Sequence, residues 1–167
     1  MRENQNTQGK KKNTNVKANQ QIQRGRVKKT QNQTKKHVSQ MAKEEILFLK
    51  RRIKLVYNSY KWSPHFLKSS RLFNMLTIER LLMTPNIEDC IIEYNQRDND
   101  KRVLLRSTFS SNVTLEKDGK NYMADANLCI VIDIYTGEII TAYWNEVGDH
   151  HDNVNMSRYD SRLKIVS

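Results

Sequence analysis

The chain has 167 residues and a formal net charge of +11, so it has room for one modest domain and an additional segment. No apolar run is long enough to cross a bilayer, and none near the start resembles a signal core, so we expect neither a membrane span nor secretion. The two cysteines, Cys90 and Cys129, are too few for a disulfide framework or a zinc pattern. We therefore expect a cytoplasmic protein without a metal or other cofactor.

The first quarter of the chain is strongly basic and poor in apolar residues. Residues 1–43 contain twelve Lys or Arg and one acidic residue, Glu3, which leaves the rest of the chain neutral. A segment of Asn, Gln, Lys and Thr buries too little apolar surface to offset its ordering entropy, so residues 1–39 are predicted to be disordered, ahead of one domain over 40–167. Such an arm is typical of non-specific binding to phosphate backbones, although a solubilising tail would have the same composition. The basic residues assigned here to substrate binding are Lys10, Lys11, Lys12, Lys28, Lys29, Lys35 and Lys36.

Two or three helices are predicted in the first half of the domain. Apolar residues at three- and four-residue spacing predict a helix over 39–60, with Ser39 as its N-cap. Ser63-Pro64 is a helix-start signal, and Thr77 is expected to cap a short helix over 78–83 that stops before the next proline. Strands follow these helices, which predicts an α+β domain with an antiparallel sheet of about four strands.

The apolar period changes from helical to alternating after Ile87. Residues 90–94 and 102–108 are predicted strands, 112–115 could continue the sheet, and 116–120 is expected to be a loop. The β-branched run over 128–134, the Thr136-Gly137 turn signal and the pattern over 139–145 together predict a β-hairpin.

The last predicted strand has two chemically different faces. Strict alternation would place Ile140, Ala142 and Trp144 on a packing face. The other face would carry Ile139, Thr141, Tyr143 and Asn145, and it leads to the polar run Asp149-His150-His151-Asp152-Asn153 and then to Arg158-Tyr159.

These residue types suit cleavage of a phosphodiester without a metal. RNA supplies its own nucleophile, the 2′-OH, so the protein needs a base, an acid for the leaving oxygen, and donors to the phosphate. A histidine titrates near neutral pH, and Arg106, which lies in an otherwise apolar strand, can contact phosphate oxygens. Two alternatives stay open: Arg106 could instead pair with Glu93 or Asp133, and the histidine run could bind a metal ion.

The order of the segments also resembles a known group of enzymes. A helical segment that begins with His65 is followed by IIEYN, RVLLRS, CIVIDIYTGEIITAYWN, DHHDN and an Arg-Tyr pair. This order resembles small bacterial ribonuclease toxins of the barnase–EndoU–colicin–RelE superfamily, over about residues 63–165. The resemblance implies helices before a four-stranded antiparallel sheet, with a ribonuclease site on a sheet face. The positions that it implies are Arg106, Thr141, Tyr143, Asn145 and a histidine, either His150 or His151, with His65 as a further candidate.

The leading hypothesis is a metal-independent, toxin-like endoribonuclease that binds RNA, with the basic arm adding electrostatic affinity and Arg158 and Tyr159 assisting in binding. A neutralising antitoxin or immunity protein would be a second partner. The alternative is a non-enzymatic nucleic-acid-binding protein, encoded by a phage or plasmid, that uses the same arm. A third possibility is a structural protein whose arm coats nucleic acid.

Overall fold

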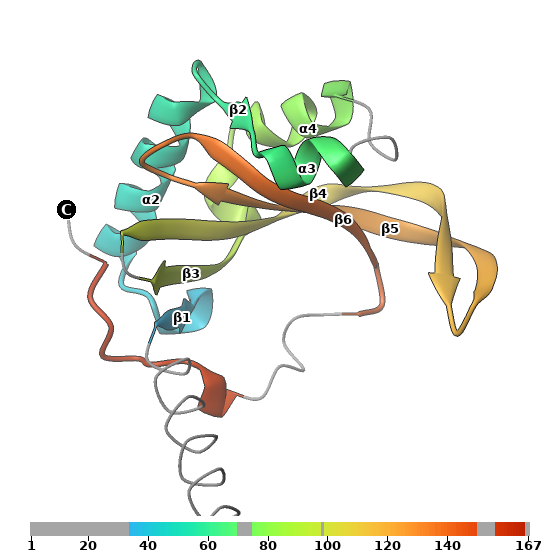
Figure 1. Ribbon diagram of the computed structural model, residues 1–167. Coiled ribbons are helices and arrows are strands. Elements are labelled where there is room, and N and C mark those ends of the chain that lie inside the picture. Colours follow the sequence, from blue (N-terminus) through green and yellow to red (C-terminus); the bar gives the residue numbers. More distant parts are fainter. Residues whose placement is uncertain (1–33, 70–74, 98, 150–155, 166–167) are drawn as a thin grey trace, which may run out of the picture.

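A mixed sheet with helices on one side forms the folded part of the chain. The computed structural model describes residues 34–69, 75–97, 99–149 and 156–165. Within these ranges, six strands form one sheet in the order β1-β3-β4-β5-β6-β2, and neighbouring strands are antiparallel except for β2, which is parallel to β6 (Figure 1). The strands are β1 (Lys35–His37), β2 (Lys61–Trp62), β3 (Ile91–Arg97), β4 (Asp100–Lys117), β5 (Lys120–Asp133) and β6 (Glu138–Glu146), and the helices are α2 (Lys43–Tyr57), α3 (Pro64–Ser69) and α4 (Met75–Leu82).

The predicted combination of helices and an antiparallel sheet is confirmed in part, but two of its details are wrong. Helices do not all precede strands, because β1 comes before α2 and β2 lies between α2 and α3. The described sheet has six strands and is mixed, where about four antiparallel strands were expected. The two additional strands are edge strands of three and two residues. Segments this short contain no periodic pattern that a sequence could reveal.

The folded domain also begins earlier than predicted. Residues 34–39 were assigned to a disordered tail, yet Lys35–His37 pairs with β3, and the amide of Gln96 donates to the carbonyl of Thr34 at 2.7 Å. The charge of Lys36 is neutralised inside the domain, because its Nζ lies 2.7 Å from Oε2 of Glu45. A polar segment can therefore enter the sheet here because its lysine has a buried acidic partner. The rest of the predicted tail, residues 1–33, lies outside the described residues.

The residues that cap the helices explain why some helices start at other positions than predicted. The first helix starts at Lys43, and Glu45 reaches back to accept from the amide of Ala42 at 2.9 Å, which is half of a capping box. Ser39, the predicted cap, instead bonds the ring of His37. The prediction at Ser63 is confirmed, since its Oγ accepts from the amide of Phe66 at 3.0 Å. Thr77 lies inside α4 and is not its cap. No helix in the described ranges is long and apolar enough to cross a bilayer.

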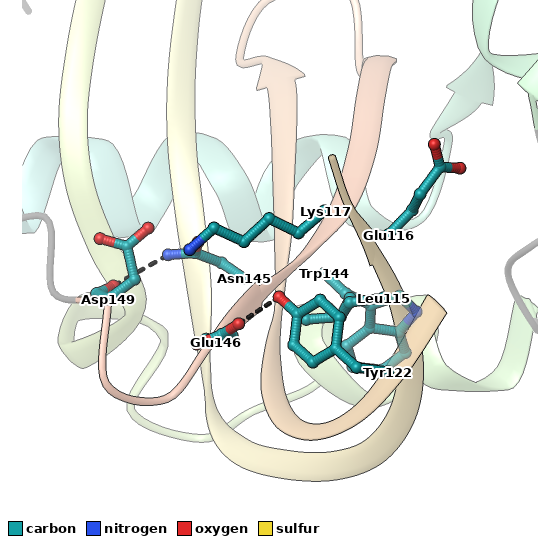
Figure 2. A pocket seen from close by; sticks show the side chains of 8 residues that line it. All are labelled: Leu115, Glu116, Lys117, Tyr122, Trp144, Asn145, Glu146 and Asp149. Atoms are coloured by element: carbon teal, nitrogen blue, oxygen red, sulfur yellow. Dashed lines mark hydrogen bonds between the residues drawn. The ribbon is translucent and has the colours of Figure 1, made fainter. Parts of the chain in front are cut away.

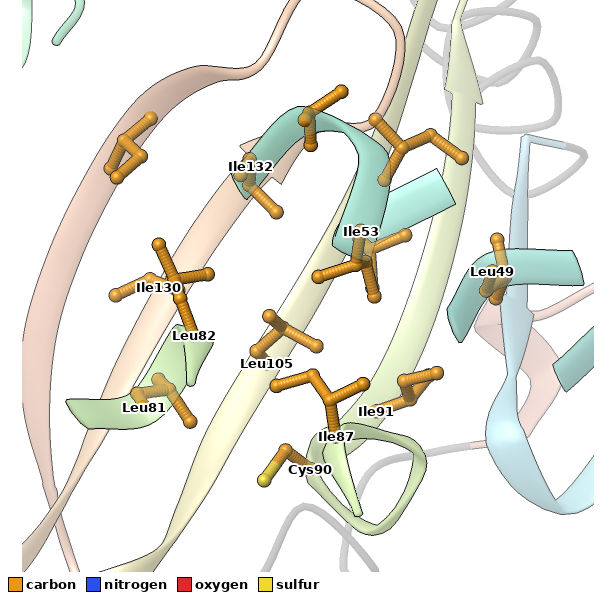
Figure 3. Packing of buried hydrophobic residues seen from close by; sticks show 14 of the residues in the cluster. Leu49, Ile53, Leu81, Leu82, Ile87, Cys90, Ile91, Leu105, Ile130 and Ile132 are labelled. Carbon is orange, nitrogen blue, oxygen red and sulfur yellow. The ribbon is translucent and has the colours of Figure 1, made fainter. Parts of the chain in front are cut away.

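The hydrophobic core lies between the helices and one face of the sheet. Ile53 of α2 and Leu81 of α4 are fully buried, and they pack over Leu105 and Ile130 of the two central strands (Figure 3). Alternate residues of β4 and β5 enter this core, as the period of two requires. Both cysteines are buried free thiols, as their apolar surroundings predicted. The helices α2, α3 and α4 therefore occupy one face of the sheet.

The two central strands continue far beyond the rest of the sheet. The partner β3 pairs with β4 only over Asp100–Leu105, and β6 pairs with β5 only over Ala126–Ile132. The remaining hairpin, residues 110–125, projects from the domain (Figure 1). From here on, the arm means this hairpin and not the basic N-terminal segment. Its tip is the two-residue turn Asp118-Gly119, where both φ angles are positive, so the loop predicted over 116–120 is much tighter than expected.

The predicted hairpin between β5 and β6 is confirmed. One carboxylate oxygen of the buried Asp133 accepts from the amides of Tyr135 and Thr136, and the other accepts from the amide of Lys101 at 3.1 Å. Gly137 has a φ of +71°, and a side chain there would meet Cβ of Val56 at 3.3 Å. This turn fixes the start of β6 and therefore the position of every later residue on that strand.

Candidate functional site on the outer face of the sheet

Polar residues of four strands gather on the face of the sheet that points away from α2, α3 and α4, which we call the outer face. Cross-strand pairing aligns Arg106 of β4 with Cys129 of β5, and Cys129 with Tyr143 of β6. The neighbouring row of paired residues on this face runs from Glu93 of β3 through Leu104 and Val131 to Thr141 of β6. Because directly paired residues share a face, strands distant in sequence contribute to one surface.

A β-bulge in β6 decides which of its residues reach this surface. Thr141 pairs with Val131, whereas Ile139 pairs with the next residue of β5, Ile132, so Ile140 is an extra residue. Ile139 is therefore fully buried in the core, and its predicted place beside Thr141 is wrong. Strict alternation failed because the bulge changes the parity of the strand. The predicted polar set Thr141, Tyr143 and Asn145 remains together after the bulge.

Glu93 stands at the centre of a small network on the outer face. Its Oε1 accepts from Nζ of Lys35 at 2.8 Å, and its Oε2 accepts from the hydroxyl of Tyr159 at 2.8 Å. The ring of Tyr159 meets the ring of His37 edge-on at 5.3 Å between centroids. The carboxylate of Glu93 therefore accepts hydrogen bonds from an ammonium group and a phenol that come from two other segments.

The guanidinium of Arg106 holds the end of β6. Its Nη1 donates to the carbonyl of Asp149 at 2.7 Å, and its Nη2 donates to the carbonyl of Glu146 at 2.8 Å. The same Asp149 carbonyl accepts from Nδ2 of Asn145 at 2.9 Å. The salt bridge to Glu93 or Asp133 that the sequence suggested for Arg106 is not formed. Glu93 instead binds Lys35, and Asp133 binds backbone amides. Arg106 and Asn145 together fix the segment that leads directly into residue 150.

A second bulge orients Arg106 itself. Three residues of β4, from Ser107 to Phe109, stand opposite one residue of β5. The buried hydroxyl of Ser107 donates to the carbonyl of Phe109 at 2.6 Å, and Asn127 donates to the same carbonyl at 3.0 Å. This leaves Oδ1 of Asn127 to accept from Nε of Arg106 at 3.0 Å. The bulge thus supplies an amide that holds the guanidinium in place.

The two tyrosines on this face are phenols that stay protonated. Burial of the hydroxyl raises the pKa of Tyr143 well above its ordinary value, with further upward contributions from Cys129 and Glu93 and an opposing one from Arg106. Burial and the hydrogen bond to Glu93 likewise raise the pKa of Tyr159. Burial raises the pKa of the Cys129 thiol to about 11. At neutral pH these groups are therefore hydrogen-bond donors rather than bases.

The structure brings together part of the predicted site. Arg106, Tyr143 and Asn145 are neighbours, with Thr141 further along the same face of β6. Tyr159 joins them through Glu93, and Arg158 is exposed on the segment beside it. His65 lies in the first turn of α3, on the helix-covered side, away from this group. His150 and His151 lie outside the described residues, as do Lys10, Lys11, Lys12, Lys28 and Lys29.

Two lysines of the predicted binding set are part of the fold. Lys35 pairs with Glu93 and keeps 38% of its side chain exposed, so it can still meet a ligand. Lys36 is buried and bonds both carboxylate oxygens of Glu45 and the carbonyl of Leu163. Lys36 therefore stabilises the domain, and its ammonium group is unsuited to the phosphate contact predicted for it.

Sequence reasoning overlooked Glu93 and Asn127 as members of this surface. Glu93 was considered only as a partner for Arg106, although an acidic residue in the apolar strand IIEYN is the same kind of signal that pointed to Arg106. Asn127 offers no comparable signal, because its role depends on the bulge in β4. We call Glu93, Arg106, Tyr143 and Tyr159 the outer-face cluster.

The outer-face cluster contains the groups that acid–base chemistry on an anionic substrate requires. A carboxylate can accept a proton, two protonated phenols can donate, and Lys35 and Arg106 supply positive charge beside them. The described residues contain no group of three or more His, Cys, Asp or Glu that could hold a metal ion. No protein-family model, curated protein or solved structure matches this chain.

Proposed function

We propose that the chain is a metal-independent endoribonuclease whose site is the outer-face cluster. The observation that carries this proposal is that Glu93 bonds Lys35 and Tyr159 beside Tyr143 and Arg106, on the sheet face opposite α2, α3 and α4. The resemblance of the segment order to ribonuclease toxins of the barnase–EndoU–colicin–RelE superfamily supports the same proposal.

In this proposal Glu93 is the base. It takes the proton of the ribose 2′-OH, the 2′-oxygen attacks the adjacent phosphorus, and the bond to the 5′-oxygen of the next nucleotide breaks. A phenol, Tyr143 or Tyr159, donates to the leaving oxygen; the raised pKa of each keeps its proton in place at neutral pH. Lys35 can exchange its bond to Glu93 for a phosphate oxygen and balance the developing charge. The products are a 2′,3′-cyclic phosphate and a free 5′-hydroxyl.

Arg106 has a positioning role in the proposed mechanism. Its contacts with the carbonyls of Glu146 and Asp149 hold the end of the segment that precedes His150-His151 in the sequence. In a variant of this mechanism, His150 or His151 is the acid in place of a phenol. Arg106 thus acts through the segment that it holds, while its charge lies beside the phenol of Tyr143.

Such an activity would have consequences in a cell. RNA is the proposed substrate, the cytoplasm is the proposed compartment, and the basic first quarter of the chain would add salt-dependent affinity for the phosphate backbone. A chain that cleaves cellular RNA would also need a neutralising antitoxin or immunity protein in the cell that makes it.

Expression in a bacterial host tests the proposal through Arg106→Ala. We expect the wild type to arrest growth and fragment RNA. The variant should cleave about 10²-fold more slowly, because a misplaced reacting group costs about that much. Arg52→Ala is the matched control, since Arg52 also donates to a backbone carbonyl, that of Ile134, but on the helix side. Intact RNA during wild-type expression, or equal fragmentation by wild type and Arg106→Ala, would contradict the proposal.

A second candidate is a nucleic-acid-binding protein without catalysis. One observation favours it: the guanidinium of Arg106 bonds backbone carbonyls and an amide oxygen, as a purely structural arginine does. The wild type itself separates the two functions. Toxicity without RNA fragmentation, unchanged when His150 and His151 are replaced together, would favour the binding protein.

A further inference from the structure

A pocket of about 400 Å³ lies between the arm and the end of β6. Leu115 and Tyr122 line it from the two strands of the arm, and Trp144 lines it from β6 (Figure 2). Neither aromatic residue is fully buried, so both rings can meet a ligand. None of the four residues of the outer-face cluster lines the pocket, and Trp144 packs against the core on the helix-covered side of the sheet.

The pocket is acidic in a chain that is strongly basic overall. The residues that line it include three acidic ones, Glu116, Glu146 and Asp149, and one basic one, Lys117. The net charge of the lining is therefore −2, in a protein whose net charge is +11. Three carboxylates beside the backbone of RNA would repel it, so this space does not suit a phosphate or a nucleic-acid strand.

The three acidic residues are spread along the lining rather than gathered at one point. The hydroxyl of Tyr122 donates to Oε1 of Glu146, which fixes that carboxylate against the aromatic wall. Glu116 and Asp149 are exposed at the opposite ends of the lining in Figure 2. Aromatic faces together with separated carboxylates are the chemistry that recognises guanidinium and ammonium groups on an organic body.

We propose that this pocket binds an organic cation, a guanidinium or ammonium group carried on an aliphatic chain that stacks against Trp144 and Tyr122. The source can be a free amine or the side chain of a protein partner, and the chemistry is the same for both. The proposal does not depend on RNA cleavage.

The pocket meets the outer face through three of its lining residues, Asn145, Glu146 and Asp149. Glu146 and Asp149 line the pocket, and the backbone carbonyl of each accepts from Arg106. A ligand that contacts these two residues therefore contacts the segment that Arg106 holds.

Nuclear magnetic resonance of the two indole N–H groups in the full chain tests the proposal directly. Agmatine represents the free amine, and acetyl-Gly-Arg-Gly-amide represents a protein side chain. Titration with either should shift the Trp144 signal with a dissociation constant below about 10 mM. The Trp62 signal should stay fixed, because its ring stacks on Phe66 at 4.6 Å in the core. Tighter binding of agmatine identifies a free amine as the source, and tighter binding of the peptide identifies a protein.

Paired variants make the outcome decisive. Glu116→Gln combined with Glu146→Gln should weaken binding at least about tenfold, since each charge-assisted contact is worth more than its neutral counterpart. Glu138→Gln, at the other end of β6 and outside the pocket, should leave binding unchanged. Thermal unfolding checks that both proteins fold. No shift of Trp144 with either probe, or equal affinity of wild type and the double variant, would overturn the proposal whatever the result of the cleavage assays.

Discussion

Glu93→Gln is expected to lower the rate of RNA cleavage by about 10²–10⁴-fold, the range attributed to one acid–base group. The amide keeps the size of the carboxylate and can still accept from Tyr159 or Lys35, so the fold should survive. It cannot take a proton from the 2′-OH. Cleavage of a labelled oligoribonucleotide by purified variant and wild type, compared at one salt concentration, provides the measurement.

Glu79→Gln is the matched control for this prediction. Glu79 also accepts a hydrogen bond from a tyrosine hydroxyl, that of Tyr60 at 3.0 Å, but it lies on α4 on the opposite side of the sheet. The same chemical change is therefore made at a carboxylate of similar bonding and different location. If both variants cleave at the wild-type rate, Glu93 is not the base, and the outer-face cluster loses its proposed role.

Lys36→Met is expected to destabilise the domain by about 3–5 kcal/mol, because it leaves a partly buried carboxylate without its cation. The side chains of Lys36 and Glu45 are only 7% and 15% exposed. The pair joins three parts of the chain, since Lys36 also donates to the carbonyl of Leu163, and Glu45 accepts from the amide of Ile165 at 3.0 Å. Urea unfolding of wild type and variant measures the difference, and a loss below about 1 kcal/mol would place this pair among ordinary surface pairs.

The pH dependence of stability gives a second measurement on the same pair. Burial alone would raise the pKa of Glu45, but hydrogen bonds from Lys36, Ile165 and Ala42 hold it below its ordinary value of 4.5. A lowered carboxylate pKa stabilises the folded state above the ordinary value, and this stabilisation is lost as pH falls through the folded pKa. Wild type should therefore lose stability below about pH 4.5. Lys36→Met should lose less over that interval, because it has already lost the main lowering contact.

The parts of the fold that could be predicted are those with a periodic or local signal. The hairpin of β5 and β6 combines a β-branched run with a turn residue, Gly137, whose positive φ the fold requires. In this hairpin a few neighbouring residues determine the geometry. Arg106 and Asn145 were placed in one site only by the resemblance, and the structure has both donate to one carbonyl, that of Asp149.

The parts that could not be predicted depend on contacts between distant segments. β1 is a strand because Lys36 forms a salt bridge with Glu45 and because the segment pairs with the edge of β3. Neither contact can be inferred from a Lys- and Gln-rich sequence. The place of Ile139 in the core depends on a one-residue bulge, which no alternation rule contains. The interior role of Lys36 and the membership of Glu93 in the outer-face cluster follow from the same long-range pairings.

The central claim, that the outer face cleaves RNA without a metal, is tested most directly by the chemistry of the products. The purified full-length chain should cleave an oligoribonucleotide in the presence of EDTA, and each new 3′ end should carry a 2′,3′-cyclic phosphate, which mass spectrometry identifies. No cleavage by the pure protein at any salt concentration, or cleavage that EDTA abolishes, would contradict it.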